Sequence, residues 1–280
     1  MRRFLIAQSE LPEEREERRR RAGKSSGETY KETLAQLCPG AVVDIVSPAD
    51  AGGERPGAEV IAGYDAVFLT GSPMHVYDRT PEVERQLSFM RVVFASGTPS
   101  FGSCAGLQVA VAAAGGRVRQ MPARLEAGIA RRIVATDEGR GHPLLDGRVP
   151  VWDAPAIHGD EVEELPAGAR RLAGNGVTRV QAAEIRHDRG TFWGVQYHPE
   201  LSIEEVALAL RDQAGELVAA GLAEREADVE ERAEALMVLH RAPDSHAARW
   251  MLGVDAEFAE EDRRRRELVN FLACAPGLRG

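Results

Sequence analysis

The 280-residue sequence contains few cysteines: Cys38, Cys104 and Cys274. A sparse, odd-numbered set of this kind is not a disulfide framework, and the lack of a C-x-x-C pair argues against zinc ligation. We therefore expect any functional cysteine to act as a single thiol. We expect neither a bound metal nor a cofactor.

Long apolar runs are also missing, since none approaches the roughly 20 residues that a membrane-spanning helix needs. The apolar start at Phe4–Ala7 ends at Gln8 and is too short for the core of a signal peptide. We expect this segment to form a buried strand. The sequence therefore predicts a cytoplasmic protein with no membrane contact.

Basic residues are in the minority, with 35 Lys and Arg against 44 Asp and Glu and a net charge of −9. An acidic protein repels the phosphates of nucleic acids, so we expect no nucleic-acid partner. Two basic runs, Arg18–Arg21 and Arg263–Arg266, each follow acidic residues. We interpret both runs as solvated helix faces of alternating charge.

Apolar, β-branched segments alternate with helix-like segments in the first part of the chain, which predicts a parallel sheet covered by helices on both faces. The fold class expected is thus α/β. The interval 116–194 is richer in strand-like segments. We expect strands at 4–8, 41–46, 64–70, 98–102, 129–135, 149–152, 170–173, 180–185 and 191–197, and helices at 28–37, 81–95 and 105–114.

The composition changes after Pro199, where residues 203–272 are rich in Ala, Glu, Leu and Arg. We expect two or three amphipathic helices there, and hence a catalytic domain at 1–203 and a helical extension at 204–280. The apolar groups 236–239 and 250–252 are expected to pack on the domain, with a partner or homodimer surface as the alternative. The charged segment 11–27 is expected to be a loop or an exposed helix start.

Cys104 lies where a predicted strand meets a predicted helix. The strand leads into Gly102, and Gly106 follows two residues after the cysteine, at positions where a side chain would collide. This is the layout of a nucleophile elbow with Cys in place of Ser. The turn sets the sulfur at the carboxyl end of the sheet and at a helix N-terminus, which favours the thiolate, while the Ala105 amide points to a developing oxyanion. A buried structural cysteine is the alternative.

A base for this thiol is available at His198, at the end of another predicted strand. Glu200 lies two residues further on, so both side chains point the same way on an extended backbone. Pro199 between them biases His198 toward that extended form. The carboxylate can therefore hold one imidazole nitrogen while the other faces the thiol.

Four segments resemble motifs of one known family, the class I (triad) glutamine amidotransferases. Residues 102–108 match G-x-C-x-G-x-Q, and residues 194–200 match G-x-Q-[FY]-H-P-E. Residues 70–78 and 158–160 resemble the S-G-G-P-x-S-V-Y-D and S-H-G-D segments of the GMP synthase glutaminase branch. The resemblance covers about residues 1–203 and implies a flavodoxin-like glutaminase domain, with Cys104 as nucleophile, His198 as general base and acid, and Glu200 as its orienter.

The resemblance also implies roles for residues around the triad. The oxyanion hole would use the Ala105 amide and a second amide from the turn formed by Gly71 and Ser72. Gln108 would help to hold the substrate. The loop at His158 would meet the α-amino and carboxylate groups of glutamine, mostly through its backbone.

The function predicted first is that of a stand-alone glutaminase, which releases ammonia for an acceptor that the sequence does not name. No P-loop or S-G-G-x-D-S motif for a synthetase follows, so a separate synthetase subunit is the partner expected. Ser72 replaces a motif glycine, and the serine expected just before His158 is absent. These differences keep open a γ-glutamyl hydrolase of the same fold. A non-catalytic regulatory protein with a relict site is the third hypothesis.

Overall fold

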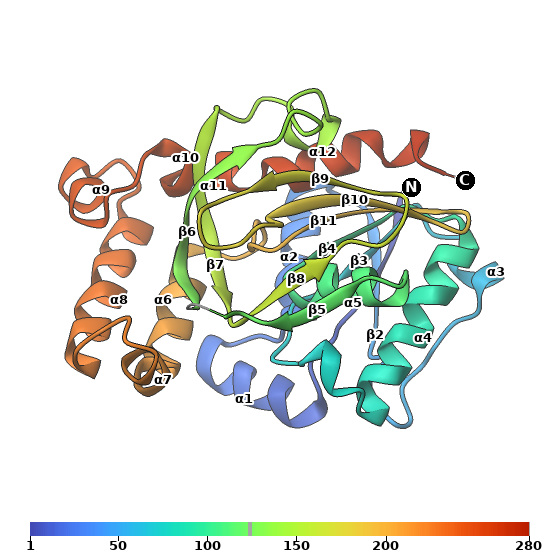
Figure 1. Cartoon of the computed structure of the whole chain (residues 1–280), viewed down its shortest axis with the longest axis horizontal. Coiled ribbons are helices and arrows are strands. Elements are labelled where there is room, and N and C mark those ends of the chain that lie inside the picture. The colour runs from blue at the N-terminus through green and yellow to red at the C-terminus, as the bar shows by residue number, and fades with distance from the viewer. Residues whose placement is uncertain (123–124, 280) are drawn as a thin grey trace.

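The computed structural model describes residues 1–122 and 125–279. The predicted β-rich interval and the predicted extension are thus described except for residues 123–124 and 280. A nine-stranded sheet forms the centre of the molecule (Figure 1). Its strands, in spatial order, are β2 (Val42–Val46), β1 (Arg3–Ala7), β3 (Ala66–Leu69), β4 (Ser100–Ser103), β11 (Gly190–Val195), β10 (Ala182–His187), β9 (Ala169–Gly174), β6 (Glu126–Ala135) and β7 (Val151–His158).

The strands β2, β1, β3, β4 and β11 pair in parallel. The remaining neighbours pair antiparallel, so that β10 and β6 run against the direction of the other strands in this sheet. The sheet is therefore mostly parallel and is flanked by helices, which confirms the predicted α/β class. Parallel strands place their carboxyl ends at one edge, and open α/β folds bind ligands there.

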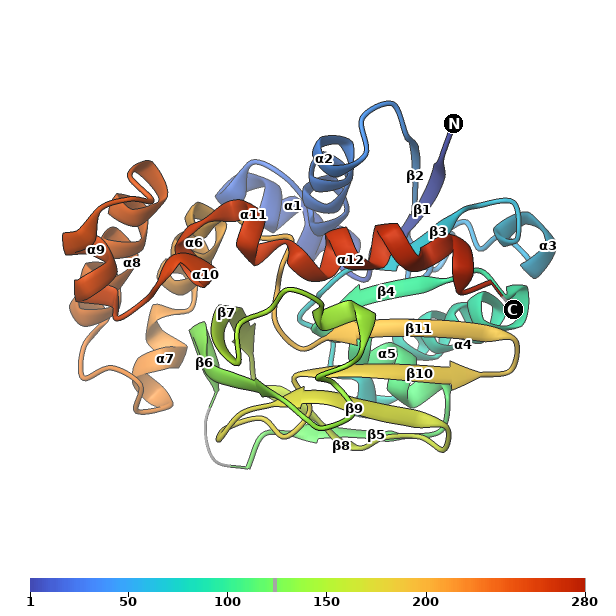
Figure 2. The same cartoon turned by 90° about the horizontal axis from the view of Figure 1, so that it is seen from above.

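The alternation of side chains along each strand divides the core between the two faces of the sheet. Leu5 and Val67 pack on one face with helices α3 (Ala58–Ile61), α4 (Pro81–Ser96) and α5 (Ala105–Ala113). Their neighbours Phe4 and Phe68 pack on the other face with α2 (Ser26–Leu37) and α12 (Arg266–Cys274). Figure 2 shows α12 lying along the sheet on the side opposite α4 and α5.

A second sheet of two strands was not expected from the sequence. It consists of β5 (Arg117–Gln120) and β8 (Asp160–Glu164), which pair antiparallel. Both strands are strongly charged, and their opposite charges face one another: Arg119 lies opposite Glu161, with 2.8 Å between guanidinium and carboxylate. Cross-strand charge pairing thus replaces the apolar alternation that sequence analysis uses to find strands.

The charged segment near the N-terminus forms helix α1 (Pro12–Ala22). An exposed helix was one of the two structures expected for this segment. None of these eleven residues is buried. Ion pairs fix the helix to the rest of the molecule; they join Arg15 to Asp50, Arg18 to Glu205, Arg19 to Glu28 and Arg21 to Asp212. Polar contacts therefore hold α1 beside α6 (Figure 1), where an apolar stripe would normally do so.

In the described part of the segment after Pro199, residues 200–279, there are seven α-helices instead of two or three. Glycines in the left-handed region interrupt it, at Gly221 (φ 71°) and Gly253 (φ 63°), and each stops a helical run. Figure 2 shows α8 and α9 at one end of the molecule, while α12 returns to the central sheet. The other helices are α6 (Ile203–Asp212), α7 (Ala214–Ala219), α8 (Glu226–Arg241), α9 (His246–Leu252), α10 (Ala256–Ala259) and α11 (Glu261–Arg264).

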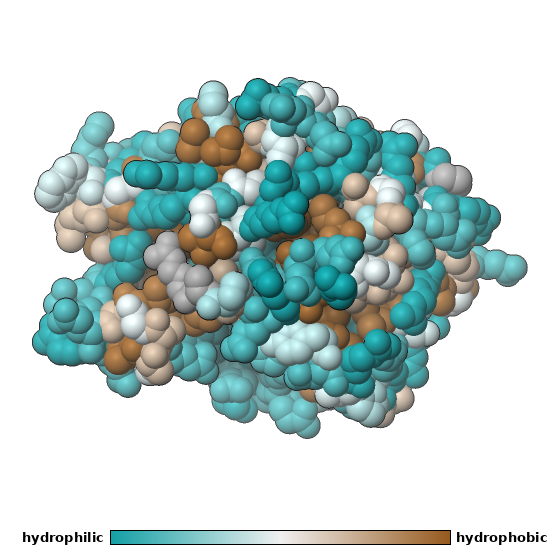
Figure 3. Space-filling view, in the orientation of Figure 1, coloured by the Kyte–Doolittle hydropathy of each residue, from teal (hydrophilic) through white to brown (hydrophobic). Residues whose placement is uncertain are grey.

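The two apolar groups of this segment differ in how far their side chains are buried. Leu236 and Leu239 of α8 and Leu252 of α9 are buried, as expected. Trp250 and Met251 are 83% and 68% exposed, so the expectation that they pack on the domain is wrong for these two side chains. The face shown in Figure 3 is mostly hydrophilic, with apolar side chains in separate small groups.

The second basic run is not a fully solvated face. Arg264 is buried, and its guanidinium donates hydrogen bonds to the carbonyl oxygens of Phe258 and Ala259. Burial lowers the pKa of Arg264 to about 10. Among the described residues, no helix is both long and apolar enough to cross a membrane.

Candidate active site

Cys104 is the residue on which strand β4 turns into helix α5. Its backbone has φ 52° and ψ −113°, a conformation that L-residues rarely adopt and that surrounding structure must enforce. A Cβ on Gly102 would lie 2.9 Å from the carbonyl carbon of Gly106, and one on Gly106 would lie 2.5 Å from the carbonyl oxygen of Leu69. Both glycines are therefore needed for the close approach of strand and helix, as the elbow pattern predicts.

His198 and Glu200 form a buried hydrogen-bonded pair at the end of β11. Nδ1 of His198 lies 2.7 Å from Oε1 of Glu200. The Ser103 hydroxyl donates to the same Glu200 oxygen at 2.8 Å, and the Tyr30 hydroxyl lies 2.8 Å from the Ser103 oxygen. This chain of buried polar groups holds the carboxylate in one orientation and, through it, the imidazole.

Sequence reasoning did not find Ser103 or Tyr30. Ser103 occupies an unspecified position inside the motif around Cys104, and only its partner shows its importance. Tyr30 lies on α2, 73 residues away in sequence. A contact over that separation leaves no local pattern that a single sequence could reveal.

The imidazole of His198 lies against Gly71, the residue that follows β3 and Thr70. A Cβ on Gly71 would lie 2.8 Å from Cε1 of His198 and 3.6 Å from Cβ of Cys104, so these three residues meet at one point. Burial by itself lowers the pKa of His198. The charge of Glu200 and the neighbouring Cys104 thiol outweigh burial, and the pKa of His198 rises to about 10.

The predicted substrate-binding side chains of Gln108 and His158 form hydrogen bonds with neighbouring segments of the protein. Nε2 of Gln108 donates to the Asp160 carbonyl and to the side-chain oxygen of Gln196, both at 3.2 Å. The ring nitrogens of His158 face the Asp160 carbonyl at 2.9 Å and a Glu126 carboxylate oxygen at 3.1 Å. With both nitrogens occupied, the His158 side chain fixes the loop and leaves its backbone to face the site.

Two further details concern the groups around the sulfur. The Cys104 sulfur lies 3.9 Å from the carbonyl oxygen of Ile157, the residue before His158. The Ser72 hydroxyl accepts a hydrogen bond from the Met74 amide at 3.3 Å, so it is turned toward its own loop. The serine that replaces the motif glycine therefore stabilises the turn after Gly71.

A cavity of about 570 Å³ connects these residues. It opens at the carboxyl edge of the sheet and is bounded by α1 and α6 on its outer side. Ala105, whose amide opens α5, directly follows the nucleophile but does not line the cavity. The other predicted site residues all line it, namely Gly71, Ser72, Cys104, Gln108, His158, His198 and Glu200.

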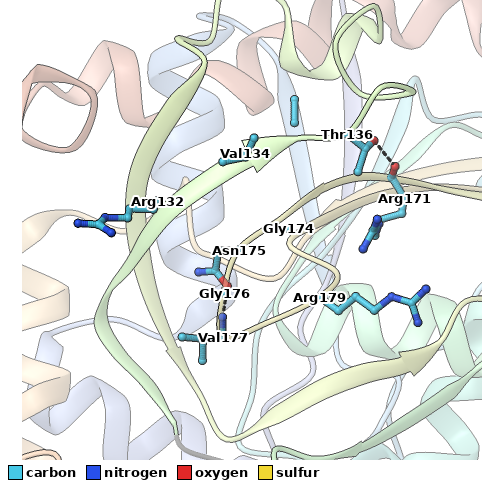
Figure 4. A pocket seen from close by; sticks show the side chains of 10 residues that line it. Arg132, Val134, Thr136, Arg171, Gly174, Asn175, Gly176, Val177 and Arg179 are labelled. Atoms are coloured by element: carbon cyan, nitrogen blue, oxygen red, sulfur yellow. Dashed lines mark hydrogen bonds between the residues drawn. The ribbon is translucent and has the colours of Figure 1, made fainter.

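A second cavity, of about 520 Å³, lies on the outer side of β6 and β9 (Figure 4). Three arginines line it, Arg132, Arg171 and Arg179, but Figure 4 shows their side chains pointing in different directions. The cavity contains none of the predicted site residues. Within residues 1–122 and 125–279, no group of three or more His, Cys, Asp or Glu side chains is arranged to hold a metal ion.

Comparison with known proteins defines the class to which this fold and site belong. The family model described as glutamine amidotransferase class-I matches residues 30–213, which is more than half of the chain. The chain therefore belongs to the class-I glutamine amidotransferase family. It is an enzyme that hydrolyses amide bonds, as the sequence predicted.

Individual relatives differ in how much of their length they share with this chain. A γ-glutamyl-L-1-hydroxyisopropylamide hydrolase from a Pseudomonas species is 39% identical, over 84% of this chain and 79% of its own. The GMP synthase of Thiobacillus denitrificans is 34% identical over 49% of this chain, but over only 25% of its own length. A glutamine-hydrolysing GMP synthase subunit from Archaeoglobus fulgidus is 32% identical over 51% of this chain and 70% of its own.

Solved structures agree with this assignment at the level of the fold. A glutamine amidotransferase from Thermotoga maritima superposes with a TM-score of 0.64 at 17% identity and covers 98% of this chain and 97% of its own. A glutamine amidotransferase from Methylobacillus flagellatus gives a TM-score of 0.59 at 18% identity, covering 100% and 95%. The covered shares include the C-terminal helices.

Proposed function

We propose that this protein is a γ-glutamyl amide hydrolase that works through Cys104, His198 and Glu200. The observation that carries the reaction type is the buried His198–Glu200 pair beside a strained cysteine in a cavity of about 570 Å³. Similarity to the Pseudomonas hydrolase over most of both chains favours a γ-glutamyl amide as substrate. The full-length GMP synthases, by contrast, align with this chain over only about a quarter of their own length.

In the first half-reaction the Cys104 sulfur attacks the γ-carbonyl carbon of the substrate. The oxyanion that forms accepts hydrogen bonds from the Ala105 amide and from an amide of the turn at Gly71 and Ser72. His198, protonated beside Glu200, gives its proton to the departing nitrogen. The carbon–nitrogen bond then breaks, the amine leaves, and a γ-glutamyl thioester remains on Cys104.

In the second half-reaction water replaces the amine. Neutral His198 takes a proton from the water as its oxygen attacks the thioester carbonyl. The carbon–sulfur bond breaks, glutamate leaves, and Cys104 and His198 return to their starting states. Glu200 keeps the imidazole oriented throughout, because it holds Nδ1 while Nε2 exchanges protons.

The glutamyl part of the substrate is assigned to the loops beside the sulfur. Gln108 and the backbone at His158 would hold its α-amino and carboxylate groups. We also retain the division into a catalytic domain at 1–203 and a helical extension at 204–280, a cytoplasmic location, and the option of a homodimer as predictions.

A glutaminase that supplies ammonia to a separate synthetase is the second candidate, favoured by the match to the Archaeoglobus GMP synthase subunit. Rates of glutamate release from γ-glutamyl alkylamides and from free glutamine distinguish the two. The hydrolase predicts faster turnover of the alkylamides by the isolated chain. Slow glutamine turnover that a synthetase accelerates, with no alkylamide cleavage, would support the glutaminase instead.

A further inference from the structure

The outer part of the catalytic cavity carries a marked excess of negative charge. Six carboxylates line it on the side of α1, α6 and α7, against two arginines, Arg18 and Arg21. Arg18 pairs with Glu205 at 3.1 Å, and Arg21 pairs with Asp212. The six carboxylates are Glu10, Glu14, Glu17, Glu205, Asp212 and Glu216.

One of these carboxylates, Glu10, is built into the wall of the cavity. Its side chain is only 5% exposed. One carboxylate oxygen, Oε2, accepts hydrogen bonds from the amide and the hydroxyl of Ser26 at the start of α2. The other oxygen, Oε1, forms an ion pair with Arg18, whose Nε lies 3.8 Å away.

Glu14 lies close enough to Glu10 for their charges to repel. Burial raises the pKa of Glu14, and the neighbouring charge of Glu10 raises it further. Two like charges at this distance are costly for a protein to keep where burial limits their hydration. A cation that enters this part of the cavity would relieve the repulsion.

The position of Glu10 indicates which part of a substrate it meets. Glu10 follows strand β1, whereas Gly71, Cys104 and His198 follow β3, β4 and β11 in spatial order along the same edge. The loop at His158 follows β7, at the far end of the sheet. Glu10 therefore reaches the cavity from β1, and the loop at His158 reaches it from β7. If the loop at His158 holds the glutamyl group, the side of the cavity at Glu10 is left for the amine.

We propose that this cavity selects γ-glutamyl amides whose leaving amine carries a second, positively charged ammonium group, and that Glu10 and Glu14 receive that group. This inference rests on the proposed hydrolase function and adds the chemical class of the leaving group. A primary ammonium offers three donors, which suits the carboxylates of Glu10 and Glu14 and the hydroxyl group of Ser26 in the same wall. A neutral alkyl group leaves the repulsion between the carboxylates in place, and a carboxylate is repelled.

The experiment compares kcat/KM for the γ-glutamyl amides of diaminobutane, butylamine and aminobutyric acid, which share a carbon chain and differ in terminal charge. We expect kcat/KM to be highest for the cationic amide, lower for the neutral amide and lowest for the anionic amide. The cationic amide should exceed the neutral amide by about tenfold or more. Diaminopropane and diaminopentane amides, tested in parallel, show which spacing reaches Glu10.

Glu10→Gln keeps the acceptor for Ser26 and removes the charge, so the cation-to-neutral ratio should fall by about tenfold. Glu13→Gln is the matched control, because Glu13 is exposed on the same helix end and does not line the cavity. Thermal unfolding of both variants verifies that they are folded.

Three outcomes would overturn the inference. One is a neutral amide cleaved as well as the cationic amides, and a second is an unchanged ratio in folded Glu10→Gln. A third is an equal loss for all amides in Glu10→Gln, which would place Glu10 at the glutamyl α-amino group. If glutamine is cleaved and no alkylamide is, the proposed hydrolase function itself is wrong.

Discussion

At the scale of single residues, the site depends on a backbone conformation that most side chains avoid. Cys104 is held at positive φ because β4 must enter α5 without an intervening loop, and the cost is met by the packing around Gly102 and Gly106. Cys38 and Cys274 have no such setting, since each is half-buried at or near the end of a helix. The structure thus singles out one thiol of three.

Replacing Cys104 with Ser should leave the fold intact and lower turnover of γ-glutamyl amides by at least about a thousandfold. A hydroxyl is isosteric with the thiol but a much weaker nucleophile beside His198. Steady-state glutamate release measures the effect, and Cys274→Ser is the matched control with full activity expected. Substantial turnover by Cys104→Ser would exclude the thioester mechanism.

The raised pKa of His198 makes stability depend on pH in a defined direction. Its pKa is about 10 in the folded protein, mainly because Glu200 and Cys104 outweigh burial, against about 6.5 in an unfolded chain. The charged imidazole therefore stabilises the fold fully below about pH 6.5, and this contribution disappears as the pH rises toward 10.

Urea unfolding at several pH values tests this dependence by comparing the protein with His198→Gln. The stability difference in favour of the native residue should shrink by a few kcal/mol, in order of magnitude, between about pH 6.5 and 10. A difference that stays constant across this range would show that the buried imidazole is neutral in the folded protein.

The triad could be predicted from sequence because each member lies in a short motif with its own local geometry. The residues that hold the triad in position could not be predicted in this way. Tyr30 and Ser103 reach Glu200 only after α2 has packed against the sheet, and Glu10 lies in a segment whose charge density suggests nothing but exposure. Burial of a polar residue depends on contacts distant in sequence, and a local pattern does not contain them.

At the scale of elements, the turn between β4 and α5 offers a direct test of close packing. Gly106→Ala would gain about 1 kcal/mol in helix propensity. Its new Cβ, however, would lie 2.5 Å from the Leu69 carbonyl oxygen, a backbone atom of the neighbouring strand. Overpacking of this kind costs about 1–3 kcal/mol, so a net destabilisation of up to about 2 kcal/mol is expected.

Activity should fall with stability in Gly106→Ala, because Cys104 lies two residues away on the same turn. Gly52→Ala serves as the control, since a Cβ there meets nothing within 4 Å. Denaturant midpoints and kcat/KM measure the two effects. A fully active and more stable Gly106→Ala would mean that the helix can move away from the strand without consequence.

Elements with an apolar pattern were predictable to within a few residues, and elements defined by charge were not. Strands β1, β2 and β3 and helices α2, α4 and α5 all lie where alternation and helix periodicity placed them. The pair β5 and β8 was missed because arginines of one strand pair with glutamates of the other, which leaves no apolar alternation to recognise. The C-terminal helices were expected to be fewer and longer, because Gly221 and Gly253 were not recognised as helix stops.

At the scale of the whole molecule, helix α12 completes the hydrophobic core on one face of the central sheet. Phe271 of α12 is fully buried, and its ring centroid lies 5.5 Å from those of Phe68 on β3 and Phe101 on β4. Trp193 on β11 lies at 5.9 Å. One face of the parallel sheet is therefore covered by a helix that follows β1 by some 260 residues in sequence, so the predicted extension and the catalytic part share one hydrophobic core.

This shared core predicts that a distant C-terminal residue controls the stability of the whole chain. Phe271→Ala should cost about 3–5 kcal/mol of unfolding free energy, because it opens a cavity against three aromatic rings. Val269→Ala on the same helix, where the side chain is 45% exposed, should change it by less than about 0.5 kcal/mol. Urea unfolding followed by tryptophan fluorescence and by activity should give coincident transitions, since the core is continuous from α12 to the strands that carry Cys104 and His198. Separate transitions, with activity surviving the loss of α12, would instead show that residues 1–203 fold on their own.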